Sequence, residues 1–257
     1  QAQRYRAAKA VLQDIYALDA EHTEAVKALE QLWEEGYTVA AHQLGKFYRD
    51  DLSTLRDHEK AEEWFRRSAE AGNDFSEYAL GKLLLTQKRW EEALGWLGKA
   101  ADHGNQFARY RLGKIYLAGE SVPKDVAKAL AYLTASADQG NQFAQYTLGK
   151  LYLLGRDVPP DREQAREWLI RAAAQGNEYA RFFLDCFDQF RDPSVMLAAT
   201  KLLYHMSRIF QSNSVPPSNP SGIRIDSKRR RRLMEKRMAM GHRADDHEEQ
   251  VSYQQTM

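Results

Sequence analysis

The side chains best suited to chemistry are spread along the chain and form no known catalytic motif. The 257 residues include a single Cys and seven His, which are His22, His42, His58, His103, His205, His242 and His247. The zinc-protease motif HExxH is absent, as are the phosphate-binding loops GxxxxGKS/T and GxGxxG. The sequence therefore predicts no catalytic residue, no metal site and no cofactor site within this chain.

Two isolated features resemble sites but have simpler interpretations. Cys186 lies on a predicted helix beside Phe182 and Phe183, where a small buried hydrophobic side chain is expected in place of a nucleophile. Residues 245–249 are acidic with one His, but an acidic run beside a basic segment is usually solvated. Neither feature is predicted to be a functional site.

The strongest chemical signal is a basic segment near the end of the chain. Residues 222–243 contain nine Lys or Arg and two acids, a net charge of +7, so the rest of the +1 chain carries −6. Five consecutive basic residues attract a phosphate backbone or an acidic protein surface, although a solvated tail is the competing interpretation. The candidate residues are Lys228, Arg229, Arg230, Arg231, Arg232, Lys236 and Arg237.

Composition places the chain among ordinary folded proteins. Hydrophobic residues make up 43% and charged residues 28%, which excludes wholesale disorder. No stretch approaches the roughly 18 apolar residues of a membrane span, so no membrane contact and a cytoplasmic location are expected. The chain begins at Gln1, which is typical of a processed product or of a piece of a longer protein, so a removed signal or an upstream domain stays open.

An internal repeat supplies the elements that carry these side chains. Leu-Gly-Lys occurs in register at 44–46, 80–82, 112–114 and 148–150, and Gly-Asn pairs follow at 72–73, 104–105, 140–141 and 176–177. The pairs recur at intervals of 32, 36 and 36 residues. A further Leu-Gly-Lys at 97–99 is out of register and is interpreted as coincidence. This period predicts a stack of helical hairpins.

Each repeat is predicted to contain two helices. One ends at Gly-Asn and carries Ala, a large aromatic, Leu or Phe, and Ala at eleven, eight, seven and three residues before the Gly, which forms one helical stripe. The Gly suits the left-handed position that ends a helix. Before the last of these helices, Asp161 and Gln164 have N-cap and N3 spacing. The second repeat is shorter, and its deletion falls between Thr86 and Trp90.

The other helix of each repeat begins after the Asn and contains Leu-Gly-Lys. A Gly inside a helix costs about 1 kcal/mol relative to Ala. Its recurrence predicts a close helix approach in which the aromatic side chain of the partner helix fills the space left by the missing side chain. The Lys that follows is expected on the exposed side of this helix, although interspersed acids favour a merely solvated surface.

These motifs resemble a known family. The pattern A-x-x-x-L-G-x-x-Y-x-x-G-x-x-V-x-x-D-x-x-x-A-x-x-W/Y-L-x-x-A/S-A-x-x-G-N-x-x-A runs from Ala108 to Ala144 and again from Ala144 to Ala180. It resembles the Sel-1-like repeat, a relative of the tetratricopeptide repeat, and covers residues 36–184. The resemblance implies an all-α, right-handed α/α solenoid that acts as a non-catalytic scaffold and binds a protein or peptide on its concave face. The partner-binding residues expected on it are Tyr48, Tyr116, Tyr152, Lys46, Lys82, Lys114 and Lys150.

The repeat and its flanks predict five segments. Residues 1–35 form N-terminal capping helices over 7–18 and 24–35, and residues 36–190 form the solenoid. Residues 191–211 form a C-terminal helix that begins at Asp192-Pro193; a capping role is favoured and a partner-binding or oligomerising role is the alternative. Residues 212–221 are a Pro-rich linker, and residues 222–257 are a basic, partly disordered tail.

The end of the chain carries a second resemblance. Residues 202–212, the Pro-rich gap and residues 226–249 are similar to the C-terminal end of some mobilisation relaxases of conjugative elements in Firmicutes, in which Sel-1-like repeats follow the nicking domain. That resemblance implies contact of the tail with DNA or with the secretion machinery. It also implies that any nicking domain lies upstream of Gln1, because this chain lacks the metal-binding His cluster of a relaxase.

Overall fold

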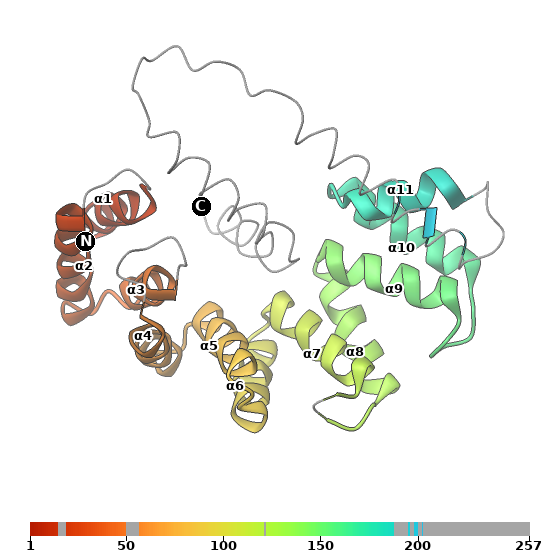
Figure 1. Ribbon diagram of the computed structural model, residues 1–257, viewed down its shortest axis with the longest axis horizontal. Helices are drawn as coiled ribbons and strands as arrows, with labels where there is room; N and C mark the ends of the chain where they lie inside the picture. Colours follow the sequence, from red (N-terminus) through yellow and green to blue (C-terminus); the bar gives the residue numbers. More distant parts are fainter. Residues whose placement is uncertain are drawn as a thin grey trace, which may run out of the picture. The chain divides into compact units, whose positions relative to one another are not determined.

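The computed structural model describes residues 1–14, 19–49, 57–120 and 122–187, together with Val195, Ala198, Ala199 and Leu202. Regular secondary structure in these residues is entirely α-helical, which confirms the predicted class (Figure 1). The helices are α1 Ala2–Gln13, α2 Asp19–Glu34, α3 Val39–Arg49, α4 His58–Glu70, α5 Asp74–Thr86, α6 Trp90–Asp102, α7 Gln106–Ala118, α8 Val126–Asp138, α9 Gln142–Leu154, α10 Arg162–Ala174 and α11 Glu178–Phe187.

The chain divides into two compact units. Unit 1 spans Gln1–Lys124 and contains α1 to α7, and unit 2 spans Asp125–Met257 and contains α8 to α11. Within the repeats, α3, α5, α7, α9 and α11 are the first helices and are called A helices below. The second helices, α4, α6, α8 and α10, are called B helices. Each unit is described by itself.

Within each unit, every helix packs against the next one along the chain. In unit 1, α3, α5 and α7 lie along one side and α4 and α6 along the other (Figure 1). The core of unit 1 includes Leu29, Leu44, Phe65 and Leu80. The core of unit 2 includes Leu153, Leu169, Phe183 and Phe187, against which Ala199 also packs. Of these, Phe65 and Leu169 stand on the helical stripe that the sequence predicts.

The same turn geometry ends every second helix, α2, α4, α6, α8 and α10. Gly36, Gly72, Gly104, Gly140 and Gly176 have φ between +85° and +95°, the left-handed region that only Gly enters at little cost. At the end of α4, the amide of Gly72 donates to the carbonyl of Ala69 and the amide of Asn73 donates to that of Ser68, which is the Schellman arrangement. The predicted helix ends are confirmed.

The Asn after each Gly starts the next helix. The side-chain oxygen of Asn105 accepts from the amides of Phe107 and Ala108 at 3.0 Å each, and Asn141 caps α9 in the same way. The start of α10 is also as predicted, since Asp161 accepts from the amide of Gln164 at 2.9 Å and from its side chain at 3.0 Å. One residue pair therefore closes a B helix and opens an A helix, which fixes the tight turn between them.

The Gly inside the A helices permits close helix contact, although the predicted partner is only partly right. A Cβ on Gly45 would lie 2.6 Å from the Phe65 ring, so an aromatic side chain fills that space. At Gly81 and Gly149, however, the partners are Leu97 and Leu169, at 2.7 and 2.8 Å from such a Cβ. The prediction of an aromatic partner is wrong there, because the residue seven before the closing Gly meets the A helix and the aromatic one place earlier points about 100° away.

The structure describes the N-terminal end of the chain more fully than the C-terminal end. The N-terminal helices are present, with α1 at Ala2–Gln13 and α2 at Asp19–Glu34, both earlier than the predicted ranges. Of the predicted C-terminal helix 191–211, only Val195, Ala198, Ala199 and Leu202 are described, and all four are helical. The linker 212–221 and the basic tail 222–257 lie outside the described residues.

Candidate protein-binding surface

The lysines of Leu-Gly-Lys occupy one position on successive A helices. Lys46, Lys82 and Lys114 lie on α3, α5 and α7 of unit 1, and Lys150 lies on α9 of unit 2. The preceding Gly faces the neighbouring B helix at Gly45, Gly81 and Gly149. A one-residue step turns the chain by about 100°, so each Lys points away from that contact. Lys114 is exposed and the other three are half-buried.

The predicted tyrosines lie on another side of the same helices. Each stands two residues after the Lys, about 200° around the helix. Tyr48 is only 8% exposed, and the ammonium of Lys60 lies 5.4 Å from the centre of its ring. Burial, followed by the charges of Glu30 and Asp57, raises the pKa of Tyr48 above its ordinary value. Tyr116 and Tyr152 are half-buried, so the predicted lysines and tyrosines do not form one surface.

An apolar row lies beside the lysines. The residue seven positions before each Lys is on nearly the same side of its helix, two turns or about 10 Å away. These residues are Val39, Phe75 and Phe107 in unit 1. Val39 is 38% exposed, Phe75 is half-buried and Phe107 is 5% exposed. The sequence contains this signal at a fixed spacing from Leu-Gly-Lys, and it was not among the predicted site residues.

Neighbouring A helices are joined by aromatic contacts. The ring centres of Tyr78 and Phe107 lie 6.1 Å apart in unit 1, and those of Tyr146 and Tyr179 lie 5.9 Å apart in unit 2. Burial raises the pKa of the Tyr146 hydroxyl to about 12. Such contacts contribute about 0.5 to 1.5 kcal/mol each beyond buried area. They fix one A helix against the next and thereby hold the lysine positions in register.

The two acids of α5 have polar partners in the turn between α6 and α7. Glu77 is 2% exposed, and its Oε2 lies 2.8 Å from Nδ1 of His103. The side-chain amide of Asn105 donates to Asp74 at 2.9 Å. Both acids stand in the first half of α5, five and eight residues before Lys82. The cationic end of this helix is therefore separated from its acidic end.

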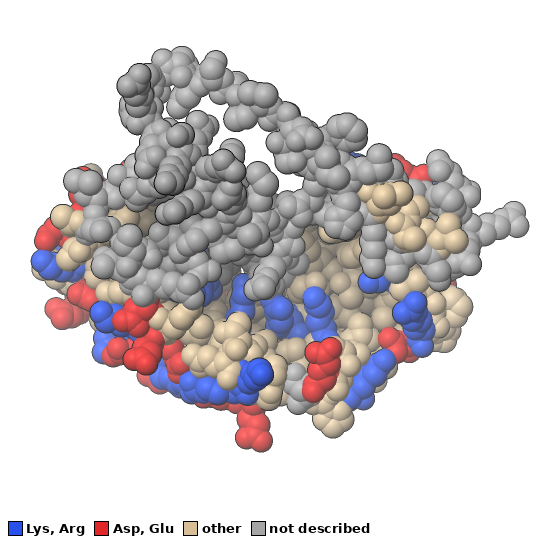
Figure 2. Space-filling model, viewed as in Figure 1, with Lys and Arg blue, Asp and Glu red and all other residues tan. Residues whose placement is uncertain are grey.

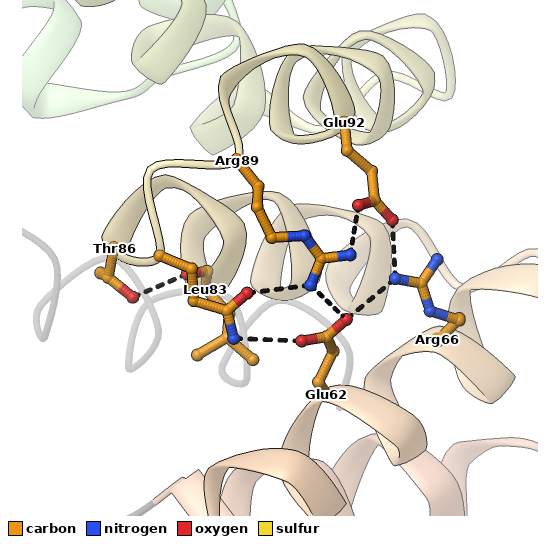
Figure 3. A network of polar contacts seen from close by, with 7 residues as sticks. Glu62, Arg66, Leu83, Thr86, Arg89 and Glu92 are labelled. Carbon is orange, nitrogen blue, oxygen red and sulfur yellow. Dashed lines mark hydrogen bonds and ion pairs between the residues drawn. The ribbon is translucent and has the colours of Figure 1, made fainter.

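The B helices of unit 1 carry an ion-pair network on their own surface (Figure 3). Arg66 donates to Glu62 at 2.9 Å and to Glu92 at 2.6 Å, and Arg89 donates to Glu62 at 2.8 Å and also contacts Glu92. Burial of Glu62 opposes its ionisation, but hydrogen bonds from Gln87, Arg66 and Arg89 outweigh burial and lower its pKa. The network joins α4 to α6 across the shortened turn of the second repeat, so its role is structural.

Side chains of catalytic type form a hydrogen-bonded chain in the core. Nδ1 of His42 lies 2.7 Å from the Ser76 hydroxyl oxygen, and Ser76 donates to the Ser68 oxygen at 2.8 Å. All three residues are buried, so this chain of hydrogen bonds joins α3, α5 and α4. Cys186 lies on α11, and its predicted burial stays a prediction.

The described part of the chain contains neither a metal-binding cluster nor a membrane-spanning helix. Among residues with defined positions, no group of three or more His, Cys, Asp or Glu side chains gathers to hold a metal ion. No helix within the same residues is long and apolar enough to span a membrane. The basic residues Lys228, Arg229, Arg230, Arg231, Arg232, Lys236 and Arg237 lie beyond the described part. The face drawn in Figure 2 shows Lys and Arg interspersed with Asp and Glu.

Comparisons with known proteins agree with this geometry. The Sel1 repeat family matches residues 38–73, 91–105, 106–141 and 142–177. A Sel1 repeat protein from Oxalobacter formigenes is 29% identical, with a TM-score of 0.66, over 81% of this chain and 87% of that one. No curated protein matches the chain.

Two more distant structures share the fold alone. The c5321 protective antigen of uropathogenic Escherichia coli is 22% identical, with a TM-score of 0.63, over 86% of this chain and 50% of that one. Immunity protein Pa5087 of Pseudomonas aeruginosa is 24% identical, with a TM-score of 0.52, over 84% of this chain and 88% of that one. Residues 38–73, 91–105, 106–141 and 142–177 of this chain are therefore Sel1 repeats.

Proposed function

We propose that the chain is a non-catalytic scaffold that binds a protein or peptide across its A helices. Sel1 repeats are typically protein-interaction scaffolds, which supports the general class. The observation that carries the proposal is the repetition of one position on the A helices. Lys46, Lys82 and Lys114 stand at the same place on three successive A helices. A repeated surface presents equivalent groups at regular spacing, which suits an extended partner.

The side of the helices that meets the partner is open to a direct test. A photo-reactive amino acid placed at Thr86 or Ala118, exposed residues near the C-terminal ends of α5 and α7, is expected to cross-link a specific protein in cells that make this chain. Both positions share the lysine side of their helices. Matched probes at Glu63 and Glu91, exposed on the B helices, are expected to give no such product. Equal cross-linking from both sides, or none from Thr86 and Ala118, would contradict the proposal.

We propose a second role for the tail, as part of the C-terminal accessory region of a mobilisation relaxase that contacts DNA or the secretion machinery. The +7 charge of residues 222–243 supports contact with a phosphate backbone. Duplex DNA is expected to bind the full chain at about 50 mM salt and to dissociate as salt rises. Replacing Lys228 to Arg232 by Gln is expected to weaken binding at least tenfold, as measured by fluorescence anisotropy. Unchanged affinity in that variant would exclude the DNA role.

A further inference from the structure

Charge in unit 1 is divided between the two sets of helices. α3, α5 and α7 together carry six Lys or Arg and two acids, a net charge of +4. α2, α4 and α6 together carry five Lys or Arg and twelve acids, a net charge of −7. In unit 2, α9 and α10 each carry +1, so the division is a property of unit 1. The near-neutral total of the chain conceals it.

Polar contacts strengthen this division at the side chains. The two acids of the A helices are Glu77, which is buried against His103, and Asp74, which accepts from Asn105. Both acids lie at the start of α5, before the last two turns, which contain Lys82 and Thr86. On the B helices, by contrast, Glu62 and Glu92 are partners of Arg66 and Arg89. The A helices therefore carry a net positive charge, whereas α4 and α6 are acidic and pair only part of their charge within the network.

The cationic positions adjoin apolar ones at a fixed distance. Lys46, Lys82 and Lys114 each follow an apolar residue by two helical turns, about 10 Å along the helix. Of these apolar residues, Val39 and Phe75 keep part of their side chains exposed. We use "A-helix face" for the surface formed by Val39, Lys46, Phe75, Lys82, Phe107 and Lys114. It combines a cationic row across three helices with an apolar row that is partly exposed at Val39 and Phe75 and buried at Phe107.

We infer that the A-helix face of unit 1 binds an acidic protein segment whose carboxylates meet the lysine row and whose apolar side chains meet the other row. This inference rests on the proposed scaffold function and names the partner class for it. Complementary charge speeds association and rejects basic partners, while apolar contacts supply affinity that salt does not screen. The inference depends on the net charge of the A helices and not on the neighbours of any single lysine.

A defined peptide tests the chemistry without knowledge of the partner. The probe is a fluorescein-labelled peptide of Glu-Glu-Leu repeats, about 15 residues long, and the control replaces every Glu by Gln. All proteins are full-length and carry Gln in place of Lys228 to Arg232, so that the tail does not capture the probe. The acidic peptide is expected to bind and the Gln peptide to bind at least tenfold more weakly at about 50 mM salt.

Matched charge reversals locate the bound peptide. The face variant carries Lys46→Glu, Lys82→Glu and Lys114→Glu. The control variant carries Lys27→Glu, Lys60→Glu and Lys99→Glu, three exposed lysines on α2, α4 and α6, and changes the net charge equally. The face variant is expected to lose affinity at least tenfold and the control less than threefold, because three attractive pairs become repulsive only on the A-helix face. Circular dichroism checks that each variant is folded. If the three Lys→Glu changes unfold the protein, Lys→Gln at the same three positions is used in their place.

Each outcome decides the inference. A loss confined to the face variant supports it. Equal losses in the two variants overturn it, because the affinity then depends on net charge alone. No binding of the acidic peptide also overturns it. If the peptide fails while cross-links persist from Thr86 and Ala118, the scaffold function stands and only the partner class is wrong. If the cross-links fail as well, the scaffold function falls with it.

Discussion

Replacing Gly81 by Ala is expected to destabilise the protein, whereas the same replacement at Gly98 is expected to stabilise it. Both residues stand within Leu-Gly-Lys and inside a helix. A Cβ on Gly81 would lie 2.7 Å from Cγ of Leu97 and 3.2 Å from the backbone oxygen of Ala93. A Cβ on Gly98 would meet no heavy atom within 4 Å beyond its own helix and chain neighbours. The motif is the same and only the surroundings differ.

The sign of each effect follows from two opposing terms. Ala stabilises a helix relative to Gly by about 1 kcal/mol. Gly98→Ala is expected to show this gain alone, because no packing contact opposes it. At Gly81 the added methyl group forces the packed helices apart, at a cost of about 1 to 3 kcal/mol. We therefore expect the free energies of unfolding of the two variants to differ by about 2 kcal/mol, as measured by urea denaturation.

A second substitution confirms the cause. Leu97→Ala alone is expected to cost about 2 to 5 kcal/mol through the cavity that it leaves. In that background Gly81→Ala is expected to cost little or to stabilise, because the atom that it would strike has gone. Destabilisation of similar size at Gly81 and Gly98, or additivity of Gly81→Ala with Leu97→Ala, would show that close helix contact is not why the Gly is there.

Glu77→Gln is expected to raise the free energy of unfolding by about 1 kcal/mol. In α7 and α9, the residue at this position of the A helix donates to a carbonyl eight residues earlier, near the end of the preceding B helix. Arg109 donates to Ala101 at 3.1 Å and Gln145 donates to Ala137 at 2.9 Å. A carboxylate has no proton to donate there and is unfavourable at a helix C-terminus. Gln restores the donor and retains an acceptor for His103.

Reciprocal variants check the explanation. His103→Ala is expected to cost about 2 kcal/mol, because the buried Glu77 carboxylate then loses its hydrogen bond with the His103 ring. Gln145→Glu, the matched change in unit 2, is expected to destabilise by about 1 to 2 kcal/mol as the donor to Ala137 is lost. Thermal unfolding followed by circular dichroism measures all three. A Glu77→Gln variant less stable than the wild-type protein would show that the contact of Glu77 with His103 contributes more than the donor that Gln adds.

Much of the fold was predictable because its signals are local. Gly-Asn fixed where a B helix ends and an A helix begins, since the contacts of Gly72 and Asn73 reach back only three and five residues. The cap of Asp161 on Gln164 spans three residues. The out-of-register Gly98 was correctly set apart, because its surroundings leave its missing side chain without a partner.

The candidate surface was only partly predictable. The lysine positions followed from the repeat, and the apolar row beside them was visible at a spacing of seven residues. The predicted tyrosines fall on another side of the helix, which helical periodicity alone could have indicated. The division of charge between α3, α5, α7 and α2, α4, α6 required helix boundaries, because the net charge of the whole chain is only +1 and does not show it.

By itself the sequence determined the repeat helices, the turns between B and A helices and the family, because those depend on interactions between residues a few positions apart. Only the tertiary structure decided which partners those helices bring together. His103 meets Glu77 from 26 residues away, and Arg89 meets Glu62 from 27. Leu97, and not the aromatic residue beside it, fills the space at Gly81. Such pairings depend on the rotation of each helix against its neighbour, which packing of whole side chains sets and which no local pattern encodes.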